Sequence, residues 1–424
     1  MFHTKTYEIK STDDIELNIK RDSLLEFKVS FDDEKPMKAL FFFIAGIRSA
    51  DYAGYEEHLA EFVVKEFEVA VIRVDYHCIG FRPQTGATLY MDKRDKEIFI
   101  EMCQKLEKRF NTSIGIGENL LSDELLNHNE TLELCGTLDT IIATLKSQNR
   151  APKDFAMPIS LSLQPTKDEY NNFGIMQALD ILNALCFVKK NPPFKLAKDY
   201  KILLFGTSHG GYLALLCAKF APWLIDAVVE NSGYANAPFR LLGFGKYIDW
   251  LNIKEVILNA SENLVFVLST KTHFNRDESS PNCYTEAHDK IRSLPELDHL
   301  QIQSTHHKPI YVSYHSAKDS TIALPEPKQR LYAMFEKLGY NATLHMIKDE
   351  SEVDGKFIKN LEHGMNMSLK TLIQKELPPL LARKFTHDKN EKHEIIYPSE
   401  NLEYHFKECA GGFELKIKTL GSGT

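Results

Sequence analysis

Residues 200–222 read YKILLFGTSHGGYLALLCAKFAP, and this stretch decides the fold. Its first part is a continuous apolar run, which is typical of a strand buried on both faces of a sheet. Its last part is predicted to be a helix. Between them the pattern G-x-S-x-G places Ser208 at a sharp bend, in a strained conformation that exposes its hydroxyl above the sheet. Gly206 and Gly210 leave room for the chain to pass close to itself, and Gly211 lets the helix pack tightly on the sheet.

Buried strands and helices alternate on both sides of this stretch. ALFFFIAG (39–46) and VAVIRVDY (69–76) are apolar runs that flank a helical pattern. KPIYVSYHS (308–316) and NATLHMIK (341–348) flank another. Strand, helix and strand in that order imply parallel pairs with right-handed crossovers. The alternation therefore predicts a doubly wound α/β sheet.

The N-terminal residues follow a different pattern. TYEI (6–9), IELNIK (15–20) and LLEFKVSF (24–31) alternate polar and apolar residues, with polar turns between them. Such segments predict antiparallel strands. We therefore expect antiparallel strands before the first buried run of the sheet.

Two excursions interrupt the alternation and suggest the domain boundaries. Residues 87–173 contain two helical patterns, and so long an insertion between strands predicts a helical lid or cap. A shorter excursion spans residues 244–308. The core is then expected to comprise residues 1–86 and 174–386. The tail, residues 387–424, returns to alternation and predicts a small C-terminal β extension.

The composition limits the classes of function. The chain has 424 residues, of which 43% are hydrophobic, and a net charge of -8 with interleaved signs. No clustered basic surface is evident, so a nucleic-acid partner is not expected. The apolar runs are far shorter than the roughly 20 residues of a membrane span, and the N-terminus lacks an apolar signal core. The 7 cysteines form no C-x-x-C pair, which indicates reduced thiols and a cytoplasmic location.

The serine motif in this setting resembles that of the α/β-hydrolases. The resemblance covers residues 39–378 without the insertion, and GTSHGG resembles the elbow of the esterase and prolyl-oligopeptidase-like branches. It implies an α/β-hydrolase fold: a mostly parallel central sheet with antiparallel N-terminal strands, a helical insertion or lid, and a small C-terminal β extension. It also implies catalytic residues in the chain order serine, acid, histidine.

Two later residues match that order. Asp319 comes just past a buried strand, where the family keeps its acid, and His363 in NLEHGMN lies on a loop after the last core strand, where the family keeps its base. His363 would take the proton of Ser208, while Asp319 would fix the imidazole tautomer and stabilise its cation. Asp349 and Asp354 are alternative acids. Asp319 in AKDST also fits a turn residue or a helix N-cap.

The same resemblance implies an oxyanion hole and a pocket mouth. The donors would be the backbone N–H of His209 and one from the loop after FFFIAG, where Ile47 is the candidate. The sequence departs from the family here, because the His-Gly pair of that loop reads Ala-Gly. Arg48 either clamps an anionic substrate group or is a solvated loop arginine. Tyr76, in the turn DYHCIGFRP, is predicted to bind substrate.

These residues predict a serine hydrolase. The favoured reaction is hydrolysis of a carboxylic ester, a small acylated metabolite or acylated sugar, through an acyl-enzyme intermediate. An acyltransferase or peptidase with the same triad, and a non-catalytic scaffold on a hydrolase core, are the alternatives. The layout with its insertion also resembles an uncharacterised bacterial hydrolase-like family found near flagellin-glycosylation genes of epsilonproteobacteria. That resemblance implies an acylated sugar of the nonulosonic type.

The sequence predicts no cofactor and no metal site. His306 and His307 are adjacent, but no acid or cysteine stands near them at ligand spacing, so a polar loop is expected there. Small-molecule esters are the only partners that the sequence indicates. It does not specify an oligomeric state.

Overall fold

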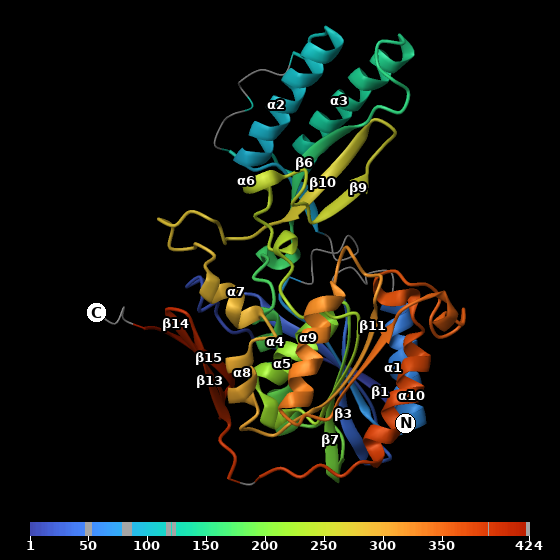
Figure 1. Cartoon of the computed structure of the whole chain (residues 1–424), viewed down its shortest axis with the longest axis vertical. Coiled ribbons are helices and arrows are strands. Elements are labelled where there is room, and N and C mark those ends of the chain that lie inside the picture. Colours follow the sequence, from blue (N-terminus) through green and yellow to red (C-terminus); the bar gives the residue numbers. More distant parts are fainter. Residues whose placement is uncertain (47–52, 79–86, 116–119, 121–123, 389, 421–424) are drawn as a thin grey trace. The chain divides into compact units, whose positions relative to one another are not determined.

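The computed structural model describes residues 1–46, 53–78, 87–115, 120, 124–388 and 390–420 (Figure 1). The chain divides into two compact units. The first unit comprises Met1–His77, Phe173–Pro238 and Tyr284–Thr424, and the second comprises Cys78–Asn172 and Phe239–Cys283. Each unit has a sheet and a hydrophobic core cluster of its own.

An eight-stranded sheet forms the centre of the first unit, in the order β1-β2-β4-β3-β7-β8-β11-β12. β2 runs antiparallel to β1 and β4, and the other pairs are parallel. The strands are β1 Phe2–Lys10, β2 Leu24–Asp32, β3 Met37–Ile44, β4 Ala70–Asp75, β7 Leu196–Thr207, β8 Ala227–Asn231, β11 Ile310–Ser316 and β12 Ala342–Ile347. This arrangement is the α/β-hydrolase fold, as the sequence predicted.

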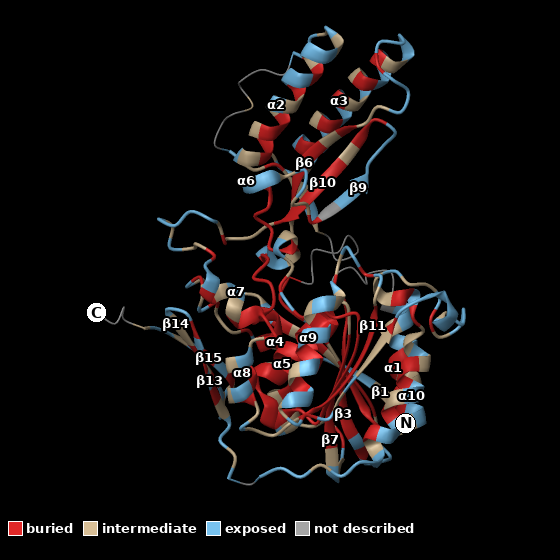
Figure 2. Cartoon of the chain, in the orientation of Figure 1, coloured by how far each residue is buried: buried red, intermediate tan, exposed pale blue. Residues whose placement is uncertain are grey.

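Helices cover both faces of this sheet (Figure 1). α1 (Ala53–Phe67) and α10 (Leu369–Ala382) pack on one face, where their apolar side chains share a core cluster with Phe41 and Phe205. The other face carries α4 Ile175–Lys190, α5 His209–Phe220 and α9 Pro325–Lys337. Figure 2 shows that the strands and the helix sides that meet them are buried. Burial on both faces explains why the strand at residues 37–44 is apolar almost throughout.

One of the expected N-terminal strands is absent, and that prediction was wrong. Residues 15–20 form a turn in which Asp14 and Ile19 make an isolated antiparallel bridge. Asn18 adopts a positive φ of 52°, and the Asp14 carboxylate accepts a hydrogen bond from the backbone N–H of Leu17 at 3.1 Å. This side-chain turn outweighs the alternation of apolar residues in the segment.

The C-terminal residues form the expected β extension. Its three antiparallel strands are β13 Glu394–Ser399, β14 Leu402–Cys409 and β15 Gly412–Thr419. They pack on α4 and on two short helices, α7 Glu286–Arg292 and α8 Leu297–Gln303. The rings of Phe220 on α5 and Phe406 on β14 stack with centroids 4.0 Å apart. The extension is thereby fixed to the helical layer of the first unit.

The second unit contains a sheet as well as the expected helices. Its four strands are ordered β5-β6-β10-β9, with β6 and β10 parallel. They are β5 Thr88–Tyr90, β6 Met157–Gln164, β9 Val256–Asn259 and β10 Leu264–Thr270, and the helices are α2 Lys93–Phe110, α3 His128–Ser147 and α6 Lys246–Asp249. The second unit therefore combines Cys78–Asn172, which includes most of the predicted insertion, with Phe239–Cys283, which overlaps the second excursion.

A buried charged group fixes the second unit internally. Nζ of Lys246 lies 2.8 Å from a carboxylate oxygen of Asp95 and 2.5 Å from one of Asp92. Asp95 also accepts hydrogen bonds from the hydroxyls of Ser160 and Ser162 on β6. These bonds compensate the cost of burying the charges, so α2, α6 and β6 are held together.

Among the described residues, no helix has the length and apolarity needed to span a bilayer.

Candidate active site

Ser208 lies at a tight turn between β7 and α5. Its φ of 53° and ψ of -120° are a backbone conformation that residues other than glycine rarely adopt. The backbone N–H of Ser208 donates to the carbonyl of Asn231 at 2.7 Å, which ties the turn to the end of β8. A Cβ on Gly206 would lie 2.2 Å from the carbonyl oxygen of Gly210, and one on Gly210 would lie 2.1 Å from that of Ile44. The turn therefore requires glycine at both positions.

The side chains of Ser208, His363 and Asp319 form a continuous chain of hydrogen bonds. Nε2 of His363 lies 2.7 Å from Oγ of Ser208, and Nδ1 lies 2.5 Å from Oδ2 of Asp319. Because an ionised carboxylate only accepts, Nδ1 carries the proton of the neutral imidazole, which leaves Nε2 to accept from the serine hydroxyl. The His363 side chain is 21% exposed and that of Asp319 is 1% exposed. Solvent therefore reaches the imidazole but not the carboxylate.

Asp319 is held in its ionised form by its surroundings. Oδ1 accepts a hydrogen bond from the backbone N–H of Ile322 at 3.1 Å. Burial opposes ionisation, but the hydrogen bond and charge of His363, with backbone N–H donors at Ile322 and Ala323, outweigh it. The pKa of the Asp319 carboxyl consequently lies below its ordinary value.

The two alternative acids are engaged in surface turns. Oδ1 of Asp349 accepts from the backbone N–H of Ser351 at 3.0 Å, and Oδ1 of Asp354 accepts from that of Phe357 at 2.7 Å. Both residues are exposed. Each carboxylate therefore acts as a cap for its own turn, while the carboxylate that contacts His363 is that of Asp319.

Two polar residues at the end of β8 hold the loop that carries His363. Nδ2 of Asn231 donates to the carbonyl of Gly364 at 3.0 Å, and the backbone N–H of Gly364 donates to Oγ of Ser232 at 3.1 Å. The Ser232 hydroxyl in turn donates to Oδ1 of Asn231 at 2.9 Å. Since Ser208 also bonds to Asn231, the serine turn and the histidine loop share one support. Sequence reasoning missed this pair, whose only signal is a polar ENS triplet at the end of an apolar strand.

The side chain that follows the serine is buried and neutral. His209 is 0% exposed, and its Nε2 lies 2.7 Å from Oε1 of Gln177. Because Nε2 of Gln177 donates to the carbonyl of His77, its Oε1 faces His209 and Nε2 of His209 carries the proton. Burial lowers the pKa of His209 to about 3, so the ring is uncharged near neutral pH. Gln177 lies on α4, whose other buried residues are mostly apolar.

Part of the predicted oxyanion hole lies within the described residues. The backbone N–H of His209 opens α5, so no carbonyl of that helix can accept from it. Ile47 and Arg48 lie outside the described residues. Directly before them, a Cβ on Gly46 would lie 3.3 Å from the Cβ of Ser208. The chain that leaves β3 therefore passes beside the serine.

Tyr76 supports the same part of the chain from inside the protein. It is 1% exposed, and its hydroxyl donates to the carbonyl of Ala45 at 2.8 Å. Its ring centroid lies 6.2 Å from that of His209. This placement fits a positioning role at the end of β3 better than the direct substrate contact that the sequence predicted.

A buried ion pair lies against the first turn of α5. Nζ of Lys328 is 2.8 Å from Oε1 of Glu230, and both side chains are 0% exposed. Oε2 of Glu230 accepts from the backbone N–H of Gly233 at 2.6 Å and would lie 3.0 Å from a Cβ on Gly211. The close packing expected of Gly211 is thus packing against this carboxylate.

Within the described part of the chain, the one group of three side chains with metal-binding atoms in reach of one another is Asp226, His307 and His387. Asp226 directly precedes β8, whereas Ser208 directly follows the parallel strand β7. The group therefore lies at the opposite edge of the sheet from the serine turn.

Residues 5–417 match a family model described as "Protein of unknown function (DUF2920)". None of the curated proteins matches the sequence significantly. Similar solved structures include a Bacteroides ovatus protein assigned as a dipeptidyl aminopeptidase IV (10% identity, TM-score 0.46), the acylaminoacyl peptidase of Pyrococcus horikoshii (12%, 0.41) and the esterase Est22 (12%, 0.39). The matches cover 91%, 91% and 83% of this chain, and 36%, 43% and 74% of those chains. The chain thus spans less than half the length of the two peptidases, and these likenesses are too distant to transfer an activity.

Proposed function

The chain belongs to the DUF2920 family, and we propose that it is a serine hydrolase that cleaves carboxylic esters through an acyl-enzyme intermediate. The observation that carries this proposal is the unbroken chain of hydrogen bonds from Ser208 through His363 to Asp319. Proteins with the α/β-hydrolase fold catalyse many different reactions, and some catalyse none. The fold alone therefore does not identify the reaction. The three side chains and the strained turn at Ser208 support nucleophilic catalysis by the serine.

The geometry supports a role for each of the three residues. As Ser208 Oγ attacks the ester carbonyl, its proton passes to Nε2 of His363. The ionised carboxylate of Asp319 stabilises the imidazolium that forms and keeps the ring in one tautomer. The proton then passes from His363 to the departing alcohol, and the same nitrogen activates the water that releases the acid from Ser208.

The proposed oxyanion hole consists of two backbone donors. The first is the N–H of His209, at the amino end of α5, where the helix also supplies partial positive charge. The second comes from the loop after β3, with Ile47 as the candidate. The close approach of Gly46 to Ser208 supports the choice of this loop as the source of the second donor. Arg48 is the proposed contact for an anionic group on the substrate.

The proposed substrate is a small acylated metabolite or acylated sugar in the cytoplasm. The sugar, and its link to flagellin glycosylation, rest on the sequence resemblance of the insertion and the FGTSHGGY elbow to the bacterial family described above. The choice of ester over peptide rests on the same resemblance. Acyl transfer to an alcohol would use the same three residues, so the reaction type is an outcome of the experiment that follows.

A series of p-nitrophenyl esters of increasing acyl length tests the proposal, with wild type and Ser208→Ala compared at equal concentration. We expect turnover by wild type, fastest for acetyl, and loss of turnover in Ser208→Ala with an unchanged circular dichroism spectrum. Ser304→Ala is the matched control, because Ser304 is partly exposed and its hydroxyl donates to the Gln301 carbonyl at the end of α8, at 2.7 Å. Equal turnover by wild type and Ser208→Ala would contradict the proposal. An acylated product formed from an added alcohol in preference to water would identify a transferase instead.

A further inference from the structure

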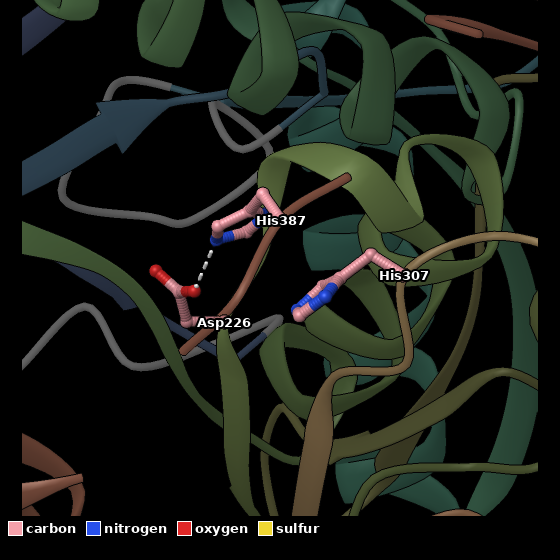
Figure 3. Close-up of side chains that lie close together, drawn as sticks. All are labelled: Asp226, His307 and His387. Carbon is pink, nitrogen blue, oxygen red and sulfur yellow. Dashed lines mark hydrogen bonds and ion pairs between the residues drawn. The ribbon is translucent and has the colours of Figure 1, made fainter. Parts of the chain in front are cut away.

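Three side chains from distant segments meet at the edge of the central sheet (Figure 3). Asp226 precedes β8, His307 precedes β11, and His387 lies between α10 and β13. Each side chain offers one potential ligand atom, and these three atoms lie within 4.8 Å of one another. Nε2 of His387 is 2.9 Å from Oδ1 of Asp226, and the ring centroids of His307 and His387 are 4.3 Å apart. The three side chains point toward one another, as Figure 3 shows.

Surrounding hydrogen bonds hold two of these residues in place. Oδ2 of Asp226 accepts from the backbone N–H of Ile202 at 2.7 Å, which leaves Oδ1 directed at His387. The backbone N–H of His307 donates to Oε1 of Glu391 at 2.6 Å. Supporting bonds of this kind orient the ligands of metal sites and raise their affinity.

One atom of the cluster lacks a hydrogen-bond partner. Nε2 of His307 is buried and makes no hydrogen bond within the described residues. A buried polar atom without a partner is costly, so nearly all such atoms in folded proteins are satisfied by protein, water or a ligand. The side chain of His387 is 43% exposed, so a ligand can reach the cluster from solvent.

Two imidazole nitrogens and one carboxylate oxygen form a donor set suited to zinc. Zn²⁺ is bound by nitrogen and oxygen donors in tetrahedral geometry, often by three protein ligands and a water. Mg²⁺ and Ca²⁺ prefer oxygen ligands throughout. Donor atoms around tetrahedral zinc lie about 3.3 Å apart. The 2.9 Å between Nε2 of His387 and Oδ1 of Asp226 is close to this spacing, and all three ligand atoms lie within 4.8 Å of one another. We propose that Asp226, His307 and His387 bind one Zn²⁺-class ion, with water as the fourth ligand.

The position of this site defines its role. Ser208 and Asp226 lie at opposite edges of the sheet, so the ion takes no part in chemistry at the serine. It instead ties the segment after α10 to the first residues of β8 and β11. An ion that binds only the folded chain stabilises it according to its concentration and affinity. The sequence predicted a polar loop at His306 and His307 because no acid stands near them at ligand spacing. Asp226 and His387, the other two proposed ligands, are distant from them in sequence and 161 residues from each other.

Zinc binding to the full, tag-free chain after treatment with EDTA tests this proposal. Calorimetric titration with Zn²⁺ near neutral pH should show one ion per chain, and the metal content after dialysis should agree. His307→Ala and His387→Ala should each weaken binding about 100-fold or more, since removal of a supporting bond alone costs about 10- to 100-fold. Zinc should raise the Tm of wild type and leave the Tm of both variants nearly unchanged.

His393→Ala is the matched control for this titration. His393 lies in the same C-terminal segment, where its ring stacks near Trp223 and its Nδ1 is 2.9 Å from Glu408, outside the cluster. The His393→Ala variant should bind zinc with the same affinity as wild type. Absence of stoichiometric binding by wild type, equal affinity in the two ligand variants, or equal weakening in His393→Ala would each overturn the site. Because His387 is partly exposed, its replacement should leave the fold intact, as circular dichroism would show.

Discussion

Nδ1 of His363 lies 2.5 Å from Oδ2 of Asp319, and this contact sets which nitrogen of the ring faces the serine. With the proton held on Nδ1, the lone pair of Nε2 is directed at Ser208, 2.7 Å away. The ionised state of Asp319 is therefore as important to the proposed reaction as the position of the imidazole.

Asp319→Asn should lower kcat for ester hydrolysis by about 10⁴-fold, because the amide can donate to Nδ1 and so favours the wrong tautomer. KM should change far less. The matched control is Asp354→Asn, which makes the same chemical change at an exposed alternative acid and should leave kcat near wild type. Steady-state kinetics on folded samples would measure both. A normal kcat in Asp319→Asn would remove this residue from the relay.

Ser232→Ala should slow catalysis without affecting substrate binding. The substitution removes the acceptor for the Gly364 N–H, a hydrogen bond that contributes about 1 kcal/mol to stability. A less well positioned His363 should lower kcat by about 10- to 100-fold, with KM unchanged. Ser232→Gly is the second variant, because it accepts the positive φ of 56° at this position while lacking the hydroxyl. Wild-type kcat in both variants would show that the hydroxyl does not position the loop.

Gly206→Ala should strongly destabilise the fold, because its Cβ would lie 2.2 Å from the backbone oxygen of Gly210. A loss of more than about 4 kcal/mol in the free energy of unfolding is expected. Gly136→Ala provides the comparison. Gly136 lies on the exposed side of α3, with nothing within 4 Å of the added Cβ, so stability should rise by about 0.5–1 kcal/mol. Urea denaturation measures both; similar effects of the two changes would contradict the tight turn.

The buried ring of His209 should make stability depend on pH. Its folded pKa of about 3 lies below the ordinary 6.5, so the folded state favours the neutral ring. The contribution of the neutral ring to the free energy of unfolding is complete above pH 6.5 and is lost as the pH falls toward 3. In that window the free energy of unfolding of wild type should fall about 1.4 kcal/mol per pH unit more steeply than that of His209→Gln. Denaturant titrations of both proteins at several pH values measure this difference in slope. The pH dependence due to all other titratable groups is common to both proteins and cancels in the difference. Equal slopes would show that the ring is not buried as described.

The fold was predictable from sequence because its signals are local. Residues 200–222 contain a strand, a bend and a helix in one continuous pattern, and the strand at 37–44 is apolar except for Lys38. The places of Asp319 and His363 were implied by the resemblance to the α/β-hydrolases, in which the acid and the base follow core strands. Their contacts with each other and with Ser208, across 44 and 155 residues, are properties of the tertiary fold.

Contacts to backbone groups could not be inferred in the same way. Asn231 and Ser232 form hydrogen bonds with the main chain of Gly364. Every residue has these backbone groups, so the residue type at position 364 gives no signal of the contact. The sheet of the second unit was missed for a related reason. Its central strands, 157–164 and 264–270, pair in parallel although several strands and helices of the first unit intervene in sequence. The domain boundaries drawn from sequence therefore remain predictions.

The most direct test of the relay from Ser208 to Asp319 is the intact mass of the chain after exposure to a fluorophosphonate. We expect one adduct per chain on Ser208, none in Ser208→Ala, much slower labelling in His363→Gln, and wild-type labelling in Ser304→Ala. A well-folded wild-type chain that takes up no label, or that is labelled at a residue other than Ser208, would contradict a serine hydrolase and favour a binding protein built on the same fold.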